Sequence, residues 1–463
     1  MTFAVTIGRN FYCRAGGNNR NSGTHGDAST PTQLPGLSAD HTYIGGSWAG
    51  GSLTYTVASG DPSADGVTVG HWFSLTEPGG TEAVYVGQIS AVTGTTITSA
   101  GGDNGTYTIP ADGVYELRVG GAFEGPVDGL TSFPFAGFGW PANNSMIWLK
   151  NDQTYQSNQT TGIFYVRNTH VSGFGTVPGD DGRAVIQGAT TGSAYTVIYT
   201  VSEGQCAHNL HVKNNGASGT ANYGFRLGNQ GVAYNCIAEG IFGYGFYKVG
   251  SGAELLAKDC TLDGYLGGDC SFVHCVASGN GRWGFWLSGD GSASHCVSMN
   301  NSNHGFHCYC NRASQLIESC ISYGNAGDGV FVGNVNRCGA IITNSLLVNN
   351  GGHGIDISTG TRHLTTRMIS NGFFGNTGGQ VRSTPGGQCF EFGSQTLTEN
   401  PFEDAAAYDW QLATDEAKAV GRRRWINPDF SVTTKTDVDL GIHDRAALGG
   451  SGSVNVFSQQ VVR

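Results

Sequence analysis

Six glycines in the second half of the chain are flanked by residue types that can do chemistry. The residues that precede them are Tyr223, Tyr244, Trp283, His304, Asp328 and His353. The residues two positions after them are Arg226, Tyr247, Trp286, His307, Phe331 and Asp356. Aromatic rings stack on sugar C–H faces and also fill protein interfaces. Imidazole and carboxylate groups move protons or bind metal ions. These two series are therefore the candidate functional residues.

We predict a role in binding a ligand or a neighbouring subunit for eight of these residues. They are Tyr244, Tyr247, Trp283, Trp286, His304, His307, Asp328 and His353. Three interpretations remain open: an aromatic face that binds glycans, an interface with another subunit or virion protein, and packing beneath loops. His304, Asp328 and His353 recur at similar intervals, so the three side chains could also bind a divalent metal or perform acid–base catalysis.

Two further segments contain metal-binding residue types. The run His304–Cys310 combines imidazoles and thiols, but on a strand His307 points away from its neighbour Cys308, so we predict no zinc site there. The acidic turn Gly179–Arg183 could hold Ca²⁺, although most such turns are simply solvated. We therefore predict no metal and no cofactor, with Ca²⁺ at this turn as the alternative.

No catalytic set is recognisable from the sequence. Asp259, Asp263, Asp269 and Asp290 are scattered over an irregular region and form no pair with the spacing of a polysaccharide-cleaving site. No phosphate-binding loop and no nucleophile elbow is present. The catalytic residues, if any exist, are therefore unknown at this stage.

The spacing of the six glycines predicts the elements that carry the candidate residues. The glycines are Gly224, Gly245, Gly284, Gly305, Gly329 and Gly354, each followed by an apolar residue. Successive glycines lie 21, 39, 21, 24 and 25 residues apart. If the interval of 39 holds two short turns, the mean period is about 22 residues, which predicts a parallel β-solenoid that rises about 4.8 Å per turn. We expect these glycines to form sharp corners at positive φ, and asparagines such as Asn300–Asn301 and Asn349–Asn350 to tolerate αL and form ladders.

Alternation along the strands predicts which side chains fill the solenoid. The apolar residue after each glycine points inward, and so does a column of small residues nine positions earlier. That column contains Cys236, Cys275, Cys296 and Cys320. Side chains in such a ladder are parallel and seldom have bridging geometry, so we expect free thiols. Free thiols fit a chain that is assembled in a reducing cytoplasm.

Composition excludes several classes of protein. The chain has 463 residues, of which 75 are glycine and 11% are aromatic, so a long helical protein and a disordered chain are both excluded. The net charge is −11, and no basic run is longer than Arg422–Arg424, so we expect no nucleic-acid partner. No apolar stretch is long enough to span a membrane, and Met1–Asn10 does not resemble a secretory signal peptide.

The chain resembles the right-handed parallel β-helix proteins of the pectin-lyase-like superfamily. Phe11–Thr24 is similar to the opening strand and the Gly/Asn turn of such helices, and Asp409–Leu412 and Ala417–Gly421 are similar to their closing segment. The superfamily includes pectate lyases, polysaccharide hydrolases, phage tailspikes and non-catalytic virion proteins. The resemblance therefore implies a fold and leaves the function open.

We predict an all-β protein with four parts. Residues 1–43 form an N-terminal cap strand and loops, and 44–122 form a small β insertion. Residues 123–400 form the right-handed parallel β-helix solenoid. Residues 401–463 form a C-terminal cap and tail, with a short helix over Thr414–Val420.

The function predicted is that of a virion structural or host-attachment protein, of the tailspike, fibre or decoration type. It would present the aromatic face to a host surface glycan or to another subunit. The alternatives are a polysaccharide-degrading lyase or hydrolase and a bacterial surface adhesin. We expect a homo-oligomer, with a trimer as one option, and contacts with other virion proteins. The expected location is the virion, after synthesis in the host cytoplasm, or else the cell surface.

Overall fold

The computed structural model shows a protein built almost entirely of strands. It describes residues 9–14, 41–81, 83–102, 109–120, 123–124, 145–152, 154–156, 164–166, 169–176, 180, 182–187, 196–200, 206–213, 222–228, 231–309, 314–333, 339–358, 364–384, 387–404 and 409–412. The helix expected over Thr414–Val420 lies outside these residues. Among the described residues, no helix is long and apolar enough to cross a membrane. The chain divides into two compact units between Asn222 and Tyr223, which we describe in turn.

The first unit, Ile7–Asn222, contains coils of parallel strands. One sheet holds β1 (Arg9–Arg14), β8 (Phe123–Glu124), β9 (Ser145–Lys150), β12 (Thr169–Phe174) and β15 (Cys206–His208). A second sheet holds β10 (Thr154–Gln156), β13 (Ala184–Gln187) and β16 (Leu210–Lys213), and a third holds β11 (Phe164–Val166) and β14 (Thr196–Thr200). From β9 onward the chain returns to the same sheet at every third strand, which is the path of a solenoid.

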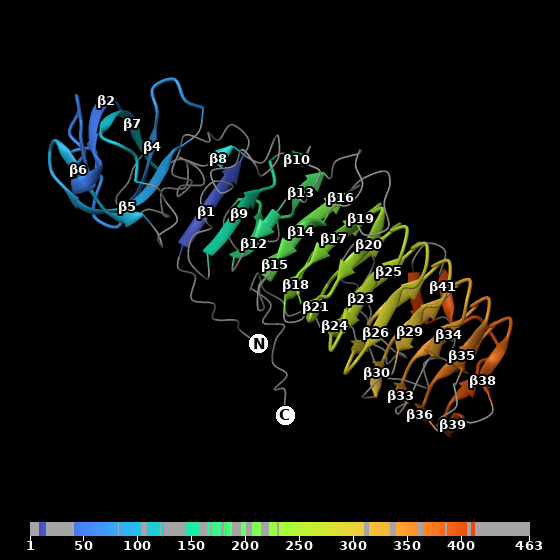
Figure 1. The fold of residues 1–463 in the computed structure, drawn as a ribbon. Helices are drawn as coiled ribbons and strands as arrows, with labels where there is room; N and C mark the ends of the chain where they lie inside the picture. Colours follow the sequence, from blue (N-terminus) through green and yellow to red (C-terminus); the bar gives the residue numbers. More distant parts are fainter. Residues whose placement is uncertain are drawn as a thin grey trace. The chain divides into compact units, whose positions relative to one another are not determined.

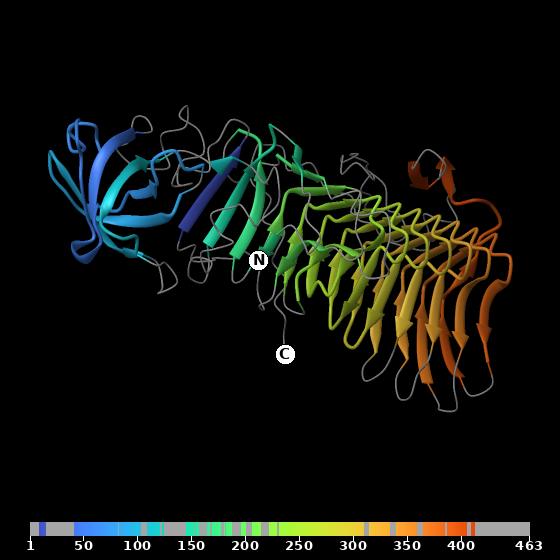
Figure 2. The same ribbon diagram turned by 45° about the horizontal axis from the view of Figure 1, so that its top comes forward.

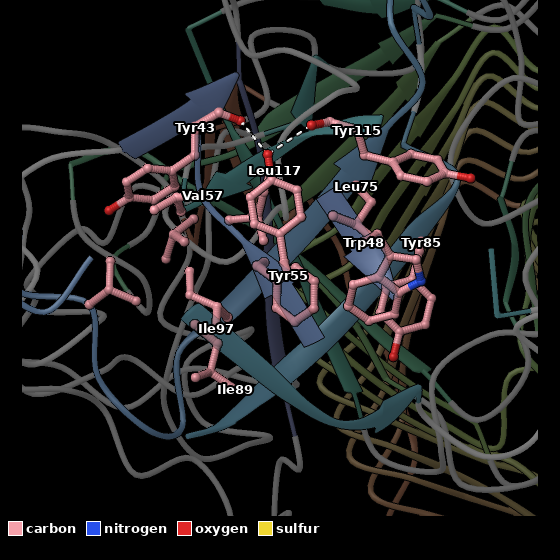
Figure 3. Packing of buried hydrophobic residues seen from close by; sticks show 13 residues of the cluster. Tyr43, Trp48, Tyr55, Val57, Leu75, Tyr85, Ile89, Ile97, Tyr115 and Leu117 are labelled. Carbon is pink, nitrogen blue, oxygen red and sulfur yellow. Dashed lines mark hydrogen bonds between the residues drawn. The ribbon is translucent and has the colours of Figure 1, made fainter. Parts of the chain in front are cut away.

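A closed antiparallel barrel follows β1 in this unit. Its strands are β2 (His41–Ala49), β3 (Thr54–Thr56), β4 (Trp72–Thr76), β5 (Tyr85–Val92), β6 (Thr96–Gly102) and β7 (Gly113–Val119), in the order β2-β3-β6-β5-β4-β7. Figure 3 shows the aromatic core, in which the buried Tyr55 hydroxyl lies 3.0 Å from the carbonyl oxygen of Tyr43 and 2.8 Å from that of Tyr115. The barrel is the small β insertion that the sequence predicts, while the four domain boundaries stay predictions.

The second unit, from Tyr223 onward, is a regular solenoid with three parallel sheets (Figures 1 and 2). Its first sheet holds β18 (Val232–Tyr234), β21 (Ser251–Ala253), β24 (Ser271–Val273), β27 (Ser292–Ser294), β30 (Gln315–Glu318), β33 (Ala340–Thr343), β36 (Leu364–Ile369) and β39 (Gly387–Phe392). Its second sheet holds β19 (Ile237–Glu239), β22 (Leu256–Lys258), β25 (Val276–Ser278), β28 (Val297–Met299), β31 (Ile321–Tyr323), β34 (Leu346–Val348), β37 (Gly372–Phe374) and β40 (Gln395–Thr396). Its third sheet holds β17 (Asn222–Arg226), β20 (Gly243–Tyr247), β23 (Tyr265–Gly268), β26 (Phe285–Ser288), β29 (Phe306–Tyr309), β32 (Val330–Gly333), β35 (His353–Ser358) and β38 (Gly379–Ser383). A hairpin of β41 (Phe402–Asp404) and β42 (Asp409–Leu412) follows. The predicted parallel β-helix is therefore confirmed.

A ladder of stacked rings fills the interior behind the third sheet. It consists of Phe225, Phe246, Tyr265, Phe285 and Phe306, all with 0% exposure. Neighbouring rings are nearly parallel, with centroids 4.8, 5.1, 4.4 and 4.9 Å apart along the ladder. The inward positions predicted from alternation are confirmed. Tyr265 belongs to the additional turn that lies in the 39-residue interval between Gly245 and Gly284. Its hydroxyl donates a hydrogen bond to the carbonyl oxygen of Val276 at 2.9 Å.

The repeat glycines serve close packing, and the prediction that they adopt positive φ is wrong. None of the six has a positive φ. A Cβ atom built on Gly245 would lie 2.7 Å from the carbonyl oxygen of Gly264, and one on Gly305 would lie 2.7 Å from that of Gly329. Glycine is required because the next turn of backbone passes too close for any side chain.

Positive φ occurs instead where strands of the first and second sheets end. After the second-sheet strands β19 to β37 the residues are Gly240, Asp259, Gly279, Asn300, Gly324, Asn349 and Gly375. Each of the last five is followed by a buried or half-buried asparagine, and these amides form a ladder. The Nδ2 group of Asn280 donates to Oδ1 of Asn301 at 2.9 Å, and that of Asn301 donates to Asn325 at 2.8 Å. The expected asparagine ladder is confirmed, and it gives buried amides partners inside the solenoid.

The cysteine column is buried and unbridged. Cys236, Cys275, Cys296 and Cys320 are at most 1% exposed, and every cysteine that the structure describes is a free thiol. Each of these four thiols donates to the carbonyl oxygen two residues earlier, as Cys320 does to Glu318 at 3.2 Å. Burial raises the pKa of Cys275 and Cys320 well above that of a free thiol, so these groups stay protonated and unreactive.

We expect Gly305→Ala to lower the free energy of unfolding of the solenoid by about 1–3 kcal/mol, because the new methyl group meets a backbone oxygen that cannot move alone. Gly268→Ala is the matched control, since its Cβ would meet only the Ser288 hydroxyl at 3.3 Å. Urea unfolding followed by circular dichroism measures both changes. Equal stability of the two variants would show that the close approach costs nothing.

Candidate functional site

Two columns of side chains lie on the face of the third sheet opposite the ring ladder. The first column contains Tyr223, Tyr244, Asp263, Trp283, His304, Asp328 and His353. The second contains Arg226, Tyr247, Leu266, Trp286, His307, Phe331, Asp356 and Arg382. We call these residues together the strip. The structure brings all eight sequence-predicted site residues into the strip, and their role in binding stays a prediction.

One end of the strip is aromatic. The ring of Tyr223 lies 5.5 Å from that of Tyr244 and 4.3 Å from that of Tyr247, measured between centroids. The guanidinium of Arg226 lies over both Tyr223 and Tyr247, at 5.4 and 5.5 Å from the ring centroids. These side chains are half-buried, so part of each ring faces solvent. Cation–π contacts and stacking hold the rings in fixed orientations.

A buried ion pair supports the central tryptophans. The Asp263 side chain is fully buried and accepts two hydrogen bonds from the Arg282 guanidinium, both at 2.6 Å, and one from the Trp283 amide at 3.2 Å. The guanidinium lies 4.1 Å from the Trp283 ring centroid. The hydrogen bonds with Asp263 raise the pKa of Arg282. The pair therefore fixes a charged plane against the face of Trp283.

Sequence reasoning missed this pair. It set Asp263 aside as one of four scattered carboxylates, because Gly264 and Tyr265 were not recognised as a repeat level. The structure shows that Asp263 precedes a repeat glycine as Trp283 does, with Tyr265 in the position of the interior phenylalanines. If the repeat pattern had allowed tyrosine as well as phenylalanine at that position, the sequence would have shown this additional turn and placed Asp263 in the strip.

His307 lies among the central aromatic rings and is uncharged. Its ring is 4.3 Å from Trp283 and is nearly parallel to Trp286 at 5.8 Å. Burial, followed by the nearby His304 and Arg282, lowers the pKa of His307 to about 3. Both nitrogens of His307 and the indole nitrogens of the two tryptophans are buried without a hydrogen-bond partner in the described part of the chain. This part of the strip therefore acts as an aromatic surface at neutral pH.

The other end of the strip is ionic. The Asp328 carboxylate lies between two imidazoles, with Oδ2 at 3.2 Å from Nδ1 of His304 and Oδ1 at 3.3 Å from Nδ1 of His353. Burial tends to raise the pKa of Asp328, but hydrogen bonds from His304 and the His353 amide outweigh it and lower that pKa. Next to them, Arg382 holds Asp356 through two hydrogen bonds. This arrangement can exchange protons between carboxylate and imidazole, or bind a cation.

Of the two other segments with metal-binding residue types, the acidic turn lies apart from this cluster in the sequence, whereas the run His304–Cys310 contributes His304 to it. At the acidic turn, the Asp180 carboxylate accepts backbone N–H groups of Gly175, Thr176 and Gly182 at 2.6, 2.6 and 3.0 Å. Gly179 and Asp181 lie outside the described residues, so Ca²⁺ binding there stays untested. In the run His304–Cys310, Cys308 is inside the solenoid with 0% exposure, on the face opposite His307.

Comparison with known proteins gives structural similarities alone. No family model matches the chain, and neither does any curated protein. Among solved structures it is similar to pectate lyase Pel9A, with 17% identity over 66% of this chain and 89% of that one at a TM-score of 0.42. It is similar to the A-module of the Azotobacter vinelandii mannuronan C-5 epimerase AlgE4, with 14% identity and a TM-score of 0.38. That match covers 56% of this chain and 90% of the epimerase module. It is also similar to the tailspike protein gp49 of Pseudomonas phage LKA1, with 14% identity and a TM-score of 0.30. That match covers 78% of this chain and 62% of the tailspike chain. The fold rests on this chain's own strand pairings, which are those of the parallel β-helix that the sequence predicts.

The low pKa of His307 makes the solenoid sensitive to acid. In the unfolded chain this imidazole titrates near 6.5 and in the folded chain near 3. Between these values the unfolded state binds more protons, so stability rises with pH and is lost as pH falls. Lowering the pH from 7 to 4.5 should therefore reduce the free energy of unfolding by about 2 kcal/mol through His307 alone.

His307→Phe keeps an aromatic ring at this position and removes the titration. Urea midpoints at pH 7 and pH 4.5 should therefore differ less in the variant than in the natural protein. The carboxylates and the other histidines are the same in both proteins, so the difference between the two losses isolates His307. An equal loss in both proteins would contradict a neutral, buried His307.

Proposed function

We propose that the protein binds a carbohydrate chain along the strip, and that it does so as the host-attachment protein of a virion. The observation that carries the proposal is two pairs of half-exposed rings on one face of the third sheet, Tyr244 and Tyr247 at β20 and Trp283 and Trp286 at β26. Each ring offers a plane for the C–H face of a sugar. Only β23 lies between these strands, so the two pairs are two turns of the solenoid apart, about 9.6 Å, and an extended chain ligand can reach both.

The rings are held in place before any ligand arrives. Trp283 is held by the Arg282 guanidinium on its ring face and by the hydrogen bond that its backbone N–H donates to Asp263 Oδ1, and the ring of Trp286 lies 5.0 Å from that of Trp283. A surface that is already ordered loses little conformational entropy on binding. Polar groups of the ionic end lie in the same columns, and they can pair with the hydroxyl or carboxylate groups of sugars. A strip that combines aromatic and polar groups is better suited to binding a glycan than to a purely apolar contact with another subunit.

The setting on a virion is supported by the buried free thiols, which fit folding in a reducing compartment. The fold by itself hosts binding proteins and enzymes alike. The enzyme alternative has a specific observation in its favour, because His304, Asp328 and His353 are groups capable of acid–base catalysis in the same strip. Incubation with the bound polysaccharide decides between them. Release of reducing ends or unsaturated products would identify a lyase or hydrolase.

The double variant Trp283→Ala/Trp286→Ala should lower the affinity for the bound polysaccharide at least tenfold, because it removes two stacking planes. Phe392→Ala is the matched control, since Phe392 is a 59% exposed aromatic residue on β39 of the first sheet. A panel of bacterial surface polysaccharides identifies the ligand, and calorimetry measures the affinities. Unchanged binding in the double variant would refute the role of the strip.

We further propose that the chain forms a homo-oligomer, with a trimer as one option, and assembles with other virion proteins. The protein should then co-purify with intact particles through a density gradient. Its absolute mass in solution, measured by light scattering, gives the number of subunits. Absence from purified particles would favour the secreted adhesin or the free enzyme.

A further inference from the structure

The geometry points to a divalent transition-metal site at the ionic end of the strip, formed by Asp328, His353 and Asp356. We infer that it takes a cation of the Mn²⁺ class, bound by two carboxylate oxygens and one imidazole nitrogen. This site goes beyond carbohydrate binding, because it requires no sugar and can be tested with the metal alone.

The donor atoms already converge. One ligand atom from each of Asp328, His353 and Asp356 lies within 4.8 Å of the other two. The Asp328 Oδ1 to His353 Nδ1 distance is 3.3 Å. Two ligands at right angles, each about 2.1 Å from a metal ion, lie about 3 Å apart. Small rotations of the Asp356 side chain therefore complete a three-donor set around one ion.

The backbone fixes the donors on adjacent levels of the solenoid. Asp328 precedes β32, and His353 and Asp356 both lie on the next strand, β35. The Asp328 carboxylate accepts the His353 amide at 2.6 Å, which holds one oxygen beside the imidazole. Preorganised donors lower the entropic cost of binding an ion.

Arg382 occupies part of this set and competes with a metal ion. Its guanidinium bonds both oxygens of Asp356, whose side chain is 0% exposed, whereas the Arg382 side chain is 52% exposed. Because the Arg382 side chain is half-exposed, it can move into solvent, and the incoming ion then takes over the pairing of the buried Asp356, which is costly to leave unpaired. A divalent ion would then replace one positive charge with two between the carboxylates of Asp328 and Asp356.

The donor types select the class of metal. Imidazole nitrogen with carboxylate oxygen suits Mn²⁺, Zn²⁺ and related ions, whereas Ca²⁺ prefers six to eight oxygens. The described cysteines of the solenoid face its interior or are otherwise covered, with only Cys389 half-buried, so no thiolate among the described residues joins this set.

The test is a titration of the full-length, untagged protein with MnCl₂, in which electron paramagnetic resonance counts the free ion. The natural protein should bind about one Mn²⁺, and Asp356→Asn and His353→Gln should each weaken binding at least tenfold. Arg382→Gln should strengthen binding at least tenfold, because it removes the competitor. Asp290→Asn, an exposed aspartate outside the cluster, is the matched control and should bind as the natural protein does.

Each result decides the proposal. Absence of Mn²⁺ binding by both the natural protein and Arg382→Gln would overturn it, and so would unchanged binding in Asp356→Asn. Equal affinity for CaCl₂ would overturn the assigned class of metal. Circular dichroism confirms that each variant is folded, and Arg382→Gln keeps all three donors should the other variants unfold. Failure here leaves polysaccharide binding at Trp283 and Trp286 unaffected, so the two proposals can fail separately.

Discussion

Hydrogen bonding between parallel strands of successive turns is the constraint on which the rest of the solenoid depends. It fixes the rise per turn at about 4.8 Å and brings the same position of each turn into one column. At that spacing, rings such as Phe246 and Tyr265 meet as parallel stacks, and amides such as Asn301 and Asn325 meet at hydrogen-bond distance. A column on the outer face obeys the same rule, so the side chains of the strip are neighbours although they lie about 20 residues apart in the chain.

The same constraint decides where glycine and left-handed backbone occur. At Gly305 the next turn passes so close that its carbonyl oxygen would lie 2.7 Å from a Cβ atom. Positive φ is found elsewhere, at the ends of strands of the first and second sheets, where polar residues such as Asn300 and Asp259 occur as well as glycines. Two different physical requirements thus produce the glycine-rich composition: room for a neighbouring backbone, and freedom to turn.

The solenoid, the inward ring column, the thiol column and the asparagine ladder could be predicted from the sequence, because each repeats one residue type at a fixed position of the turn. It did not show the turn that contains Gly264, where tyrosine replaces phenylalanine, and so it did not show the Asp263–Arg282 pair. Nor could it show that Arg382 bonds Asp356, because Arg382 lies on β38, beyond the last repeat glycine. Contacts between different residue types in one column have no periodic signal, and only the register of the strands reveals them.

The order of residues along the strip separates two kinds of chemistry on one scaffold. Rings dominate from Tyr223 to His307, and charge dominates from Asp328 to Arg382. The boundary is His307, whose pKa is lowered by burial and by the nearby His304, so its imidazole is neutral. Beyond it, the carboxylate of Asp328 lies beside the imidazoles of His304 and His353, and that of Asp356 is paired with Arg382. The strip can therefore offer stacking planes at one end and a cation-binding group at the other, with each end tuned by its own neighbours.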